Sequence, residues 1–484
     1  MARIVVVGAG MGGLAVAARL AVKRHEVTLC ERSGGHGGML GSFRRGGFAF
    51  TSGATVLTLP AVYRDLFLKT GAALEECVDL VGVDPTTRCS FDRGATVVDV
   101  PNATRAGAAA AFDGAFGSGA GADWNRFMDR GAAMWGVMRT GFFEVPSEPA
   151  KPRRATGGFK DFRTTMPWRT LRPLARSYLR DPRLRMHAER FALGAGLDPR
   201  QAPATVAVLP YLEQTFGLWT VRGGLHLIAD ALFERCLERG VKFLAHTEVA
   251  EVSAPGGTVD GVVLADGSRI DADAVVADGC GDALAVGGAA APRAKSGTER
   301  ASGYAELHLA LRGRTPEQPY RTYLFPDDPA AEAEALFGAD GRPPADPTLC
   351  VTAPGDDGSA PEGDEAWTVH VRVPPHGSGG ERGTVDWDAP GVREQYAETV
   401  VDALARRGLP VADRLRWSEL RTPADVERAT GAPGGRVAAS PVSGGRPNRS
   451  KTAGLYEVGA GAHPGGGLIG VGMGAALVAE LIGR

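Results

Sequence analysis

The chain has 484 residues and a formal net charge of −2. This length allows two or three domains, and the charge balance argues against nucleic acid as the main partner. Six scattered cysteines without a C-x-x-C pair indicate a reducing compartment, with neither a disulfide framework nor a structural zinc site. The N-terminus carries no secretory pattern, and the apolar run 465–482 contains many glycines and Glu480. We therefore expect a cytoplasmic protein without a membrane span.

The segment from Arg3 to Arg32 has the pattern of a dinucleotide-binding βαβ unit. A β-branched strand precedes three glycines in G-x-G-x-x-G spacing, an Ala/Leu-rich helix, and a second strand that ends in an acid. The glycines permit a tight turn, close approach to a pyrophosphate and close helix–strand packing, and the helix N-terminus offers N–H groups to phosphates. The residues concerned are Gly8, Gly10, Gly13 and, for a ribose, Glu31. The alternative is a glycine-rich turn without a ligand.

Glycines cluster again in residues 34–41, directly after this unit. Their missing side chains would let the backbone lie against a ligand, and the alternative is a flexible loop. A short strand that turns at Gly53 and a helix over 60–70 are predicted next. A hairpin over 87–100 and helices within 103–145 follow.

The segment 151–190 differs in composition from the rest of the chain. Twelve Lys and Arg against three acids leave an excess of nine positive charges, and aromatic residues are interleaved with them. Such a mixture suits a surface that lies on anionic lipid headgroups. The alternative is a solvated helical face whose charges pair with acids elsewhere, and both interpretations stay open.

The second half of the chain is predicted to return to the nucleotide unit and then to form a separate sheet. The elements expected in the returning part are a helix over 225–239 and strands over 241–244, 249–252 and 272–278. Residues 300–312 and 366–373 alternate like strands of a different sheet, and 326–364 between them is predicted to be mainly surface loop with a short helix. His308, on an apolar strand, is expected to be a satisfied core residue.

The C-terminal end repeats the pattern of strand, glycine loop and helix. A strand over 454–461 runs into the glycine-rich loop 463–472, and a helix continues to Leu481. A second helix N-terminus of this kind suits a cofactor with a second electron-rich region. A flavin is such a cofactor, because a helix dipole near its N1/O2 edge stabilises the anionic reduced ring.

These motifs together resemble the phytoene desaturase (carotenoid dehydrogenase) family. The motifs that carry the resemblance are GAGMGGL at 8–14, Glu31-Arg32, Gly37-Gly38, FTSGATV at 50–56, Arg222-Gly223-Gly224 and VGAGAHPG at 458–465. The resemblance is most specific at the two ends of the chain. It is weak over 100–205 and 310–440, the stretches that should supply the substrate domain.

The resemblance implies an α/β fold with a Rossmann-like FAD-binding domain, of the amine-oxidase and glutathione-reductase type, and an inserted α+β substrate domain. The implied divisions are 1–100, 216–290 and 441–484 for FAD binding, 101–215 for a helical substrate- or membrane-facing region, and 291–440 for the substrate-domain sheet and loops. Members of the family insert double bonds into long polyenes by hydride transfer to FAD. An apolar small-molecule substrate and peripheral contact with the inner face of a membrane through 151–190 are therefore expected, and no nucleic acid.

The resemblance also implies which residues bind FAD. They are Gly8, Gly10, Gly13, Glu31, Arg32, Gly38, Met39, Thr55, Val56, Val249, Gly461, Gly470, Val471 and Met473. Among them, Glu31 would bind the adenosine ribose, Val249 would pack by the adenine, and Thr55 would lie near the flavin ring.

The chain departs from the family pattern at three positions. Met39 stands where an arginine is usual, Ser52 replaces a common aspartate, and Ala54 replaces a proline. Residues 37–43 look more like the carotenoid isomerase and retinol saturase branch. The alternatives to a desaturase are therefore an FAD-dependent oxidase or isomerase of a secondary metabolite, and a non-catalytic flavin-binding lipid carrier.

His463 is the single candidate catalytic residue, because it lies in the glycine turn expected to face the flavin, where a proton donor would be useful. The alternative is a loop histidine that caps backbone groups. Neither a Ser-His-Asp set nor a metal site is expected, because the nine histidines show no H-E-x-x-H or similar spacing.

Overall fold

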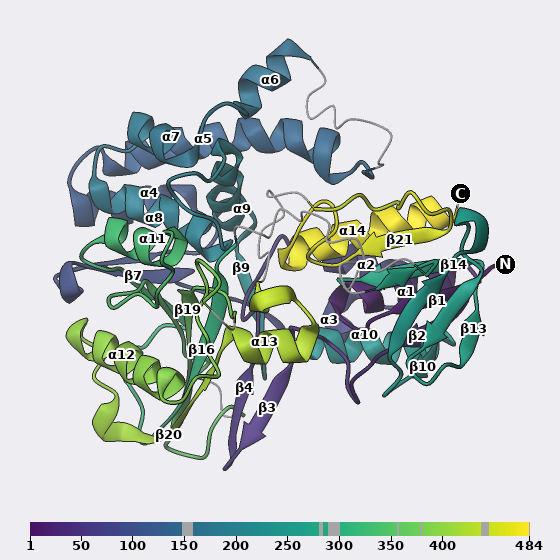
Figure 1. Ribbon diagram of the computed structural model, residues 1–484. Coiled ribbons are helices and arrows are strands. Elements are labelled where there is room, and N and C mark those ends of the chain that lie inside the picture. The colour runs from purple at the N-terminus through teal and green to yellow at the C-terminus, as the bar shows by residue number, and fades with distance from the viewer. Residues whose placement is uncertain are drawn as a thin grey trace.

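The computed structural model describes residues 1–147, 158–279, 284–288, 301–355, 358–377, 380–436 and 445–483. Figure 1 shows three parts: a sheet region that contains both chain termini, a second sheet region on the opposite side, and a layer of helices above the second one. No helix within the described ranges is both long enough and apolar enough to span a bilayer.

A five-stranded parallel sheet forms the region that contains the termini. Its strand order is β10-β2-β1-β14-β21, so only β14 separates the first strand of the chain from the last. The β-branched run of β1 is buried except at its first residue, as expected of a central parallel strand. The strands are β1 (Arg3–Val7), β2 (Glu26–Cys30), β10 (Lys242–Leu244), β14 (Ala274–Asp278) and β21 (Leu455–Val458).

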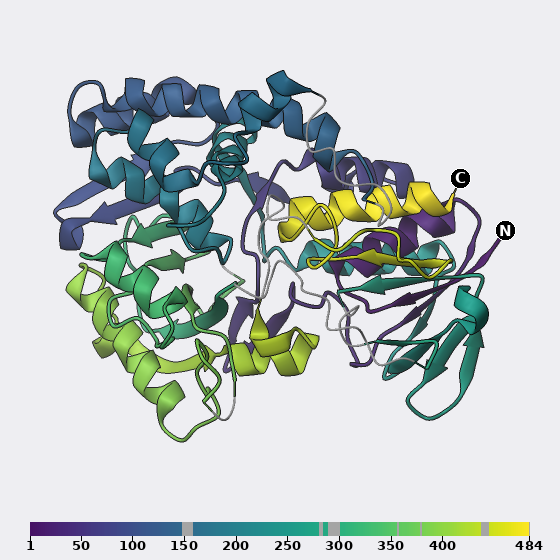
Figure 2. The same ribbon diagram turned by 45° about the horizontal axis from the view of Figure 1, so that its top comes forward.

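Each face of this sheet is covered by a different layer. Ile4 and Val6 pack in one apolar core with the helices α1 (Met11–Val22), α10 (Leu227–Glu238) and α14 (Gly467–Ile482). Val5 and Val7 on the other face pack against a small sheet, which lies at the lower right in Figure 2. The strands of the small sheet are β11 (Val249–Ser253), β12 (Gly261–Leu264), β13 (Arg269–Asp271) and β15 (Ala285–Val286).

A seven-stranded sheet forms the second region, in the order β20-β16-β19-β18-β17-β7-β8. Alternate residues of its strands, such as Leu307 and Val369, pack against helix α12 (Val392–Arg406) in an apolar core. The opposite face carries polar side chains. The strands are β7 (Thr87–Phe91), β8 (Thr96–Val100), β16 (Gly303–Leu311), β17 (Arg321–Leu324), β18 (Leu349–Thr352), β19 (Glu365–Val373) and β20 (Leu415–Arg421).

The helical layer is formed by residues 105–216, in the first half of the chain. Helix α8 begins after Asp181, whose carboxylate accepts a hydrogen bond from the Arg183 N–H, and Pro182 occupies its first position. Phe112, Phe127 and their neighbours form the core of the layer. The helices are α4 (Arg105–Phe116), α5 (Ala120–Met138), α6 (Phe159–Thr165), α7 (Leu171–Tyr178), α8 (Pro182–Gly194) and α9 (Val208–Phe216).

Shorter elements connect these parts. They are β3 (Ser42–Arg45), β4 (Phe48–Thr51), β5 (Leu57–Thr58), α2 (Ala61–Thr70), α3 (Leu74–Cys77), β6 (Leu80–Gly82), β9 (Leu218–Val221), α11 (Pro329–Phe337) and α13 (Pro423–Thr430). The predicted helix over 60–70 and the predicted helix over 225–239 correspond to α2 and α10.

Two expectations differ from the structure. The hairpin over 87–100 forms, but β7 pairs with β17 and therefore belongs to the seven-stranded sheet, so a first FAD-binding segment that ends at residue 100 is too long. The segment 326–364 is not only loop and helix, because Leu349–Thr352 forms β18 between β17 and β19. Both errors concern pairing with distant strands, which local sequence patterns do not encode.

Candidate functional site

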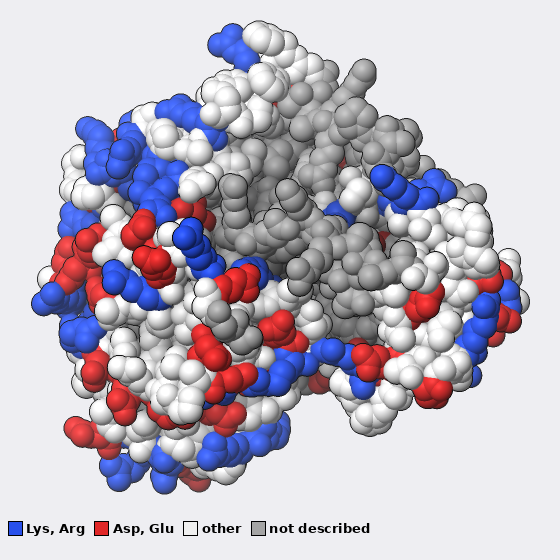
Figure 3. All heavy atoms as spheres, in the orientation of Figure 1, with Lys and Arg blue, Asp and Glu red and all other residues white. Residues whose placement is uncertain are grey.

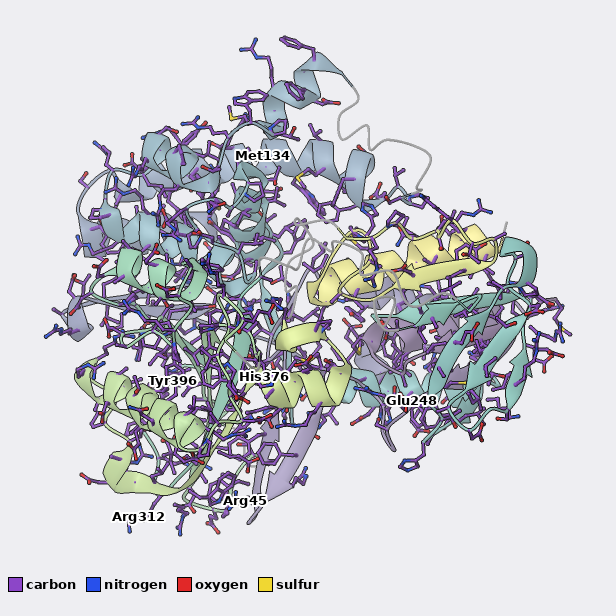
Figure 4. The ribbon with its side chains drawn as sticks, viewed as in Figure 1. Arg45, Met134, Glu248, Arg312, His376 and Tyr396 are labelled. Atoms are coloured by element: carbon purple, nitrogen blue, oxygen red, sulfur yellow. The ribbon has the colours of Figure 1, made fainter. Side chains whose placement is uncertain are left out.

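A cavity of about 1030 Å³ lies between the five-stranded sheet, the seven-stranded sheet and the helical layer. Glycine-rich loops after β1, β2 and β21 form one part of its wall, and side chains of β17, β18, β19 and the end of α8 form another. In Figure 4 the labelled Glu248, which lines the cavity, lies on the five-stranded side, and Tyr396 on α12 lies on the far side of the seven-stranded sheet.

Two helices begin at this cavity without a side-chain cap. Gly10 is the N-cap of α1 and Gly466 is the N-cap of α14; neither caps its helix with a side chain, and neither helix has an acid in its first turn. The two chain ends meet here, since a Cβ added to Gly12 would lie 2.9 Å from the backbone nitrogen of Gly459. Two positive dipole ends thus face one cavity, and no side chain of either N-cap residue occupies the N–H groups there.

The shape of this wall fits FAD. A Cβ on Gly13 would lie 2.0 Å from the Gly8 carbonyl oxygen, so only glycine lets helix and strand pack this closely. Gly38, in a left-handed conformation (φ +60°), would place a Cβ 3.1 Å from the Gly10 Cα atom. No side chain therefore covers the backbone at the place where a diphosphate would need N–H donors.

The Glu31 carboxylate lies at the end of β2 on the cavity wall. It accepts hydrogen bonds of 2.8 Å from the N–H groups of Ala9 and Ser33. These bonds hold the carboxylate beside the first glycine loop, where it retains acceptor capacity for a ribose hydroxyl. The side chain of Arg32 instead donates to the Arg428 carbonyl oxygen, at 3.0 Å.

Most of the predicted site residues lie together in the structure. Those that line the cavity are Gly8, Gly10, Glu31, Arg32, Gly38, Met39, Thr55, Val56, Val249, Gly461 and Val471. Gly13, Gly470 and Met473 do not line it. Gly13 lies beneath the loop, Gly470 is buried within α14, and Met473 packs against the core of the helical layer.

The structure does not place His463 on the cavity wall. Its side chain is buried, and Nε2 lies 2.7 Å from the Phe142 carbonyl oxygen and 3.0 Å from that of Val145. This geometry matches a histidine that caps backbone groups between α14 and the helical layer. The geometry does not support a role for His463 as a proton donor to the flavin.

Asp278 at the end of β14 is a site residue that the sequence analysis missed. Its carboxylate lines the cavity between the two glycine loops and accepts a hydrogen bond of 2.9 Å from the Gly13 N–H. Burial and the nearby Glu31 raise the pKa of Asp278 to about 6, although its hydrogen bonds oppose this. The sequence could have indicated this residue, because an acid at the carboxyl end of a buried parallel strand lies where ligands bind.

The second missed feature is the polar wall, defined here as the cavity-lining residues of the seven-stranded sheet and of α8 and α9 that carry polar groups. They are Arg190, Glu213, Tyr304, Arg321, Tyr323, Cys350, His370 and Arg372. Glu213 bonds Arg190 at 2.6 Å and Arg321 at 3.0 Å. Burial opposes ionisation of Glu213, but the two guanidinium groups outweigh it and lower the pKa of the carboxyl to about 2.

Strand alternation explains how the polar wall arises. His370 and Arg372 alternate along β19 with Val369 and Val371, which lie in the apolar core against α12. The sequence analysis noted the alternation but assigned it only to sheet formation. These polar side chains therefore face the cavity, whereas the alternating valines face the apolar core.

Comparison with known proteins identifies the family. Flavin-containing amine oxidoreductases match residues 11–277, more than half of the chain. The chain belongs to this family. It is 31% identical to the hydroxyneurosporene desaturase of Cereibacter sphaeroides, over 96% of this chain and 94% of that protein. It is 28% identical to a 4,4'-diapolycopene oxygenase of Methylomonas sp, over 96% and 95%.

The fold is shared with a solved oxidoreductase. An oxidoreductase from Methanosarcina mazei covers 99% of this chain and all of its own length, with a TM-score of 0.64 and 19% identity. The expected Rossmann-like FAD-binding fold and the resemblance to carotenoid desaturases are confirmed. The chain is an FAD-dependent oxidoreductase, and its cofactor is FAD.

Proposed function

We propose that this oxidoreductase desaturates a carotenoid or another long apolar isoprenoid. The observation that carries the proposal is the 31% identity, over nearly the whole chain, to a desaturase of hydroxyneurosporene. The cavity supports it, because it extends past the glycine loops that would hold FAD to a wall formed by the helical layer and the seven-stranded sheet. Apolar side chains such as Phe191, Leu209 and Leu212 line it beside the glycine loops.

The proposed chemistry requires little from the side chains beyond binding and shielding. When bound, FAD would supply the two-electron acceptor. The substrate would lose a hydride to it from one carbon and a proton to water from the neighbouring carbon, and a double bond would remain between the two carbons. The cavity-lining glycines of the two helix N-termini would hold the diphosphate and flavin. Glu31 would orient the ribose, and the apolar wall would hold the polyene and exclude water.

The test is an anaerobic reaction of the flavin-loaded protein with phytoene in detergent. Desaturation predicts bleaching of the yellow flavin together with a new polyene absorption at longer wavelength. An isomerase would change the polyene without net bleaching, and a lipid carrier would bind it without either change. The reaction is repeated with oxygenated carotenoids. If neither phytoene nor these carotenoids bleach the flavin, the proposal is contradicted.

We also propose that the helical layer contacts a membrane, from which so apolar a substrate would enter. The residues Phe159, Phe162 and Trp168 are 75%, 44% and 60% exposed. The ring centroids of Phe162 and Trp168 lie 5.0 Å apart. Figure 3 shows Lys and Arg gathered on part of the helical layer. Such an aromatic group beside basic residues suits a headgroup region.

Ion pairs reduce the basic excess of the segment 151–190. Arg180 pairs with Asp123 at 2.8 Å and Arg190 pairs with Glu213 at 2.6 Å, and both acids lie outside the segment. Residues 151–157 lie outside the described ranges. The support for membrane contact therefore comes from the exposed aromatic side chains more than from the net charge.

A further inference from the structure

Arg372 is a buried cation on the polar wall. No carboxylate among the described residues forms an ion pair with it. Only 8% of the residue is exposed, and it lines the cavity. Its Nη2 donates to the Gly194 carbonyl oxygen at the end of α8, whereas its Nη1 is buried without a hydrogen-bond partner among the described residues. This residue of the cavity wall therefore has a donor that no described residue uses.

The other arginines of this sheet face have carboxylate partners. Arg190 and Arg321 share Glu213, and Arg421 pairs with Glu306 at 3.2 Å. No carboxylate of the described residues lies within ion-pair distance, 4.0 Å, of Arg372. Taking an ion out of water costs several kcal/mol unless a partner of opposite charge repays it, so this position is suited to receive an anion.

His370 adds a second unsatisfied nitrogen on the same strand face. It lies two residues before Arg372, so the two Cα atoms are roughly 7 Å apart along the strand. Its Nδ1 is engaged by the Tyr304 hydroxyl, whereas its buried Nε2 has no partner within the described part of the chain. Burial lowers the pKa of His370 to about 3, with smaller contributions from His308, Arg321 and Arg372, so the ring is neutral at physiological pH.

The surroundings of these two groups restrict the ligand. Leu193, Leu209 and Leu212 line the same cavity and favour a ligand with an apolar body. A guanidinium binds a carboxylate with strong, directional hydrogen bonds, and its unbalanced charge favours an anion over a neutral oxygen.

We propose that Arg372, assisted by His370, binds the terminal carboxylate of a long apolar polyene. The substrate class would then be isoprenoid acids rather than plain hydrocarbons. This inference rests on the proposed function, because that function supplies the polyene. The relatives named as a hydroxyneurosporene desaturase and a 4,4'-diapolycopene oxygenase show that oxygen-bearing polyenes occur among the named reactions of similar proteins.

The test measures binding to the flavin-loaded protein and needs no turnover. All-trans-retinoic acid and all-trans-retinol share a carbon skeleton and differ at the terminal group, so their affinities can be compared by quenching of tryptophan fluorescence. The wild type should bind the acid at least tenfold more tightly. Arg372→Met should weaken the acid by at least tenfold and retinol by less than threefold, and Arg372→Lys should restore part of the loss.

Two further readouts separate a ligand site from a structural role. Because Arg372→Met removes an unbalanced buried charge, its melting temperature should equal or exceed that of the wild type, and its FAD content should not change. Arg416→Met is the matched control: its side chain, on the same sheet, is 48% exposed and paired with Asp364 at 2.8 Å. This control should bind both ligands as the wild type does.

Three results would overturn the inference. They are equal binding of acid and alcohol by the wild type, an equal loss of both ligands in Arg372→Met, and a lower melting temperature or FAD content in that variant. The proposed function fails separately. A protein that selects the acid but converts no polyene would retain the binding site and lose the desaturase assignment, and one that desaturates hydrocarbons without selecting the acid would do the reverse.

Discussion

The Asp278 carboxylate accepts a hydrogen bond from the Gly13 N–H at 2.9 Å and so lies at the first turn of α1. Burial raises its pKa to about 6 from an ordinary 3.8. The folded protein therefore holds this proton more tightly than the unfolded chain does. The stability from this group is fully present below about pH 4 and is lost as the pH rises through 6, by about 3 kcal/mol in total.

The first prediction follows from this pKa. In Asp278→Asn the side chain stays neutral, so the variant should gain stability relative to the wild type as the pH rises from 4 to 6. The gain should then level off. Urea unfolding of both flavin-free proteins at pH 4, 5, 6 and 7 measures the difference, from which the shared titrations cancel. A difference that is constant with pH would contradict the raised pKa.

The second prediction concerns the ribose contact. Glu31→Ala should raise the FAD dissociation constant by about tenfold or more, because hydrogen bonds to a charged group contribute roughly 1.5–3 kcal/mol each. Flavin content after dialysis measures the effect. Glu31→Gln keeps one acceptor oxygen and should lose less, and Glu76→Ala removes an exposed acid on α3 as a control. Equal flavin retention in all three variants would mean that the carboxylate does not contact the cofactor.

The third prediction tests the approach of the two chain ends. A Cβ in Gly12→Ala would lie 2.5 Å from the Asp278 Oδ1 atom and 2.9 Å from the Gly459 nitrogen. Relief of this overlap should cost about 1–3 kcal/mol of unfolding free energy and reduce FAD retention. Gly114→Ala, on the exposed side of α4 and away from the cavity wall, has open space around its Cβ and should behave as the wild type. A stable, fully yellow Gly12→Ala protein would refute this packing.

The fourth prediction separates stability from catalysis at His463. Because the ring bonds two carbonyl oxygens outside the cavity wall, His463→Ala should lower the melting temperature. Turnover per bound flavin should change by less than about threefold, whereas loss of a general acid would cost about 100-fold or more. Anaerobic flavin reduction kinetics decide between these outcomes, and the larger loss would restore the catalytic assignment.

The fifth prediction addresses the membrane. Replacement of Phe159, Phe162 and Trp168 by serine should reduce co-sedimentation with vesicles of phosphatidylcholine and phosphatidylglycerol, since each exposed ring would otherwise bury apolar surface in the headgroup region. Leu68→Ser alters an equally exposed apolar residue on α2, away from the helical layer, and serves as the control. Unchanged sedimentation of the triple variant would mean that this face is simply solvated.

The sequence predicts the nucleotide half of the site well because that half depends on local geometry. Gly8, Gly10 and Glu31, which line the cavity, belong to a single βαβ unit, in which turn, helix start and strand end are fixed by neighbouring residues. The C-terminal glycine loop was predicted for the same reason. Its meeting with the first loop, through Gly12 and Gly459, follows from their strands' positions on either side of β14.

The substrate half was predicted poorly because it depends on pairing between distant strands. His308 was expected to be a satisfied core residue, and its Nδ1 does lie 3.3 Å from the Thr368 hydroxyl. Its buried Nε2 lies 3.8 Å from the Glu306 carboxylate and has no hydrogen-bond partner within the described ranges. Arg190 and Arg321 meet Glu213 from three separate elements. No spacing within one segment encodes such a cluster.

The alternation along β19 places specificity and stability on opposite sides of one strand. Exchanges at His370 or Arg372 can therefore alter which molecules enter the cavity while Val369 and Val371 continue to anchor the sheet on α12. Insertion of a single residue into β19 would exchange its two faces. The valines would then face the ligand, and Arg372 would face the apolar core. Diversification of such a pocket must proceed by replacement and not by changes in strand length.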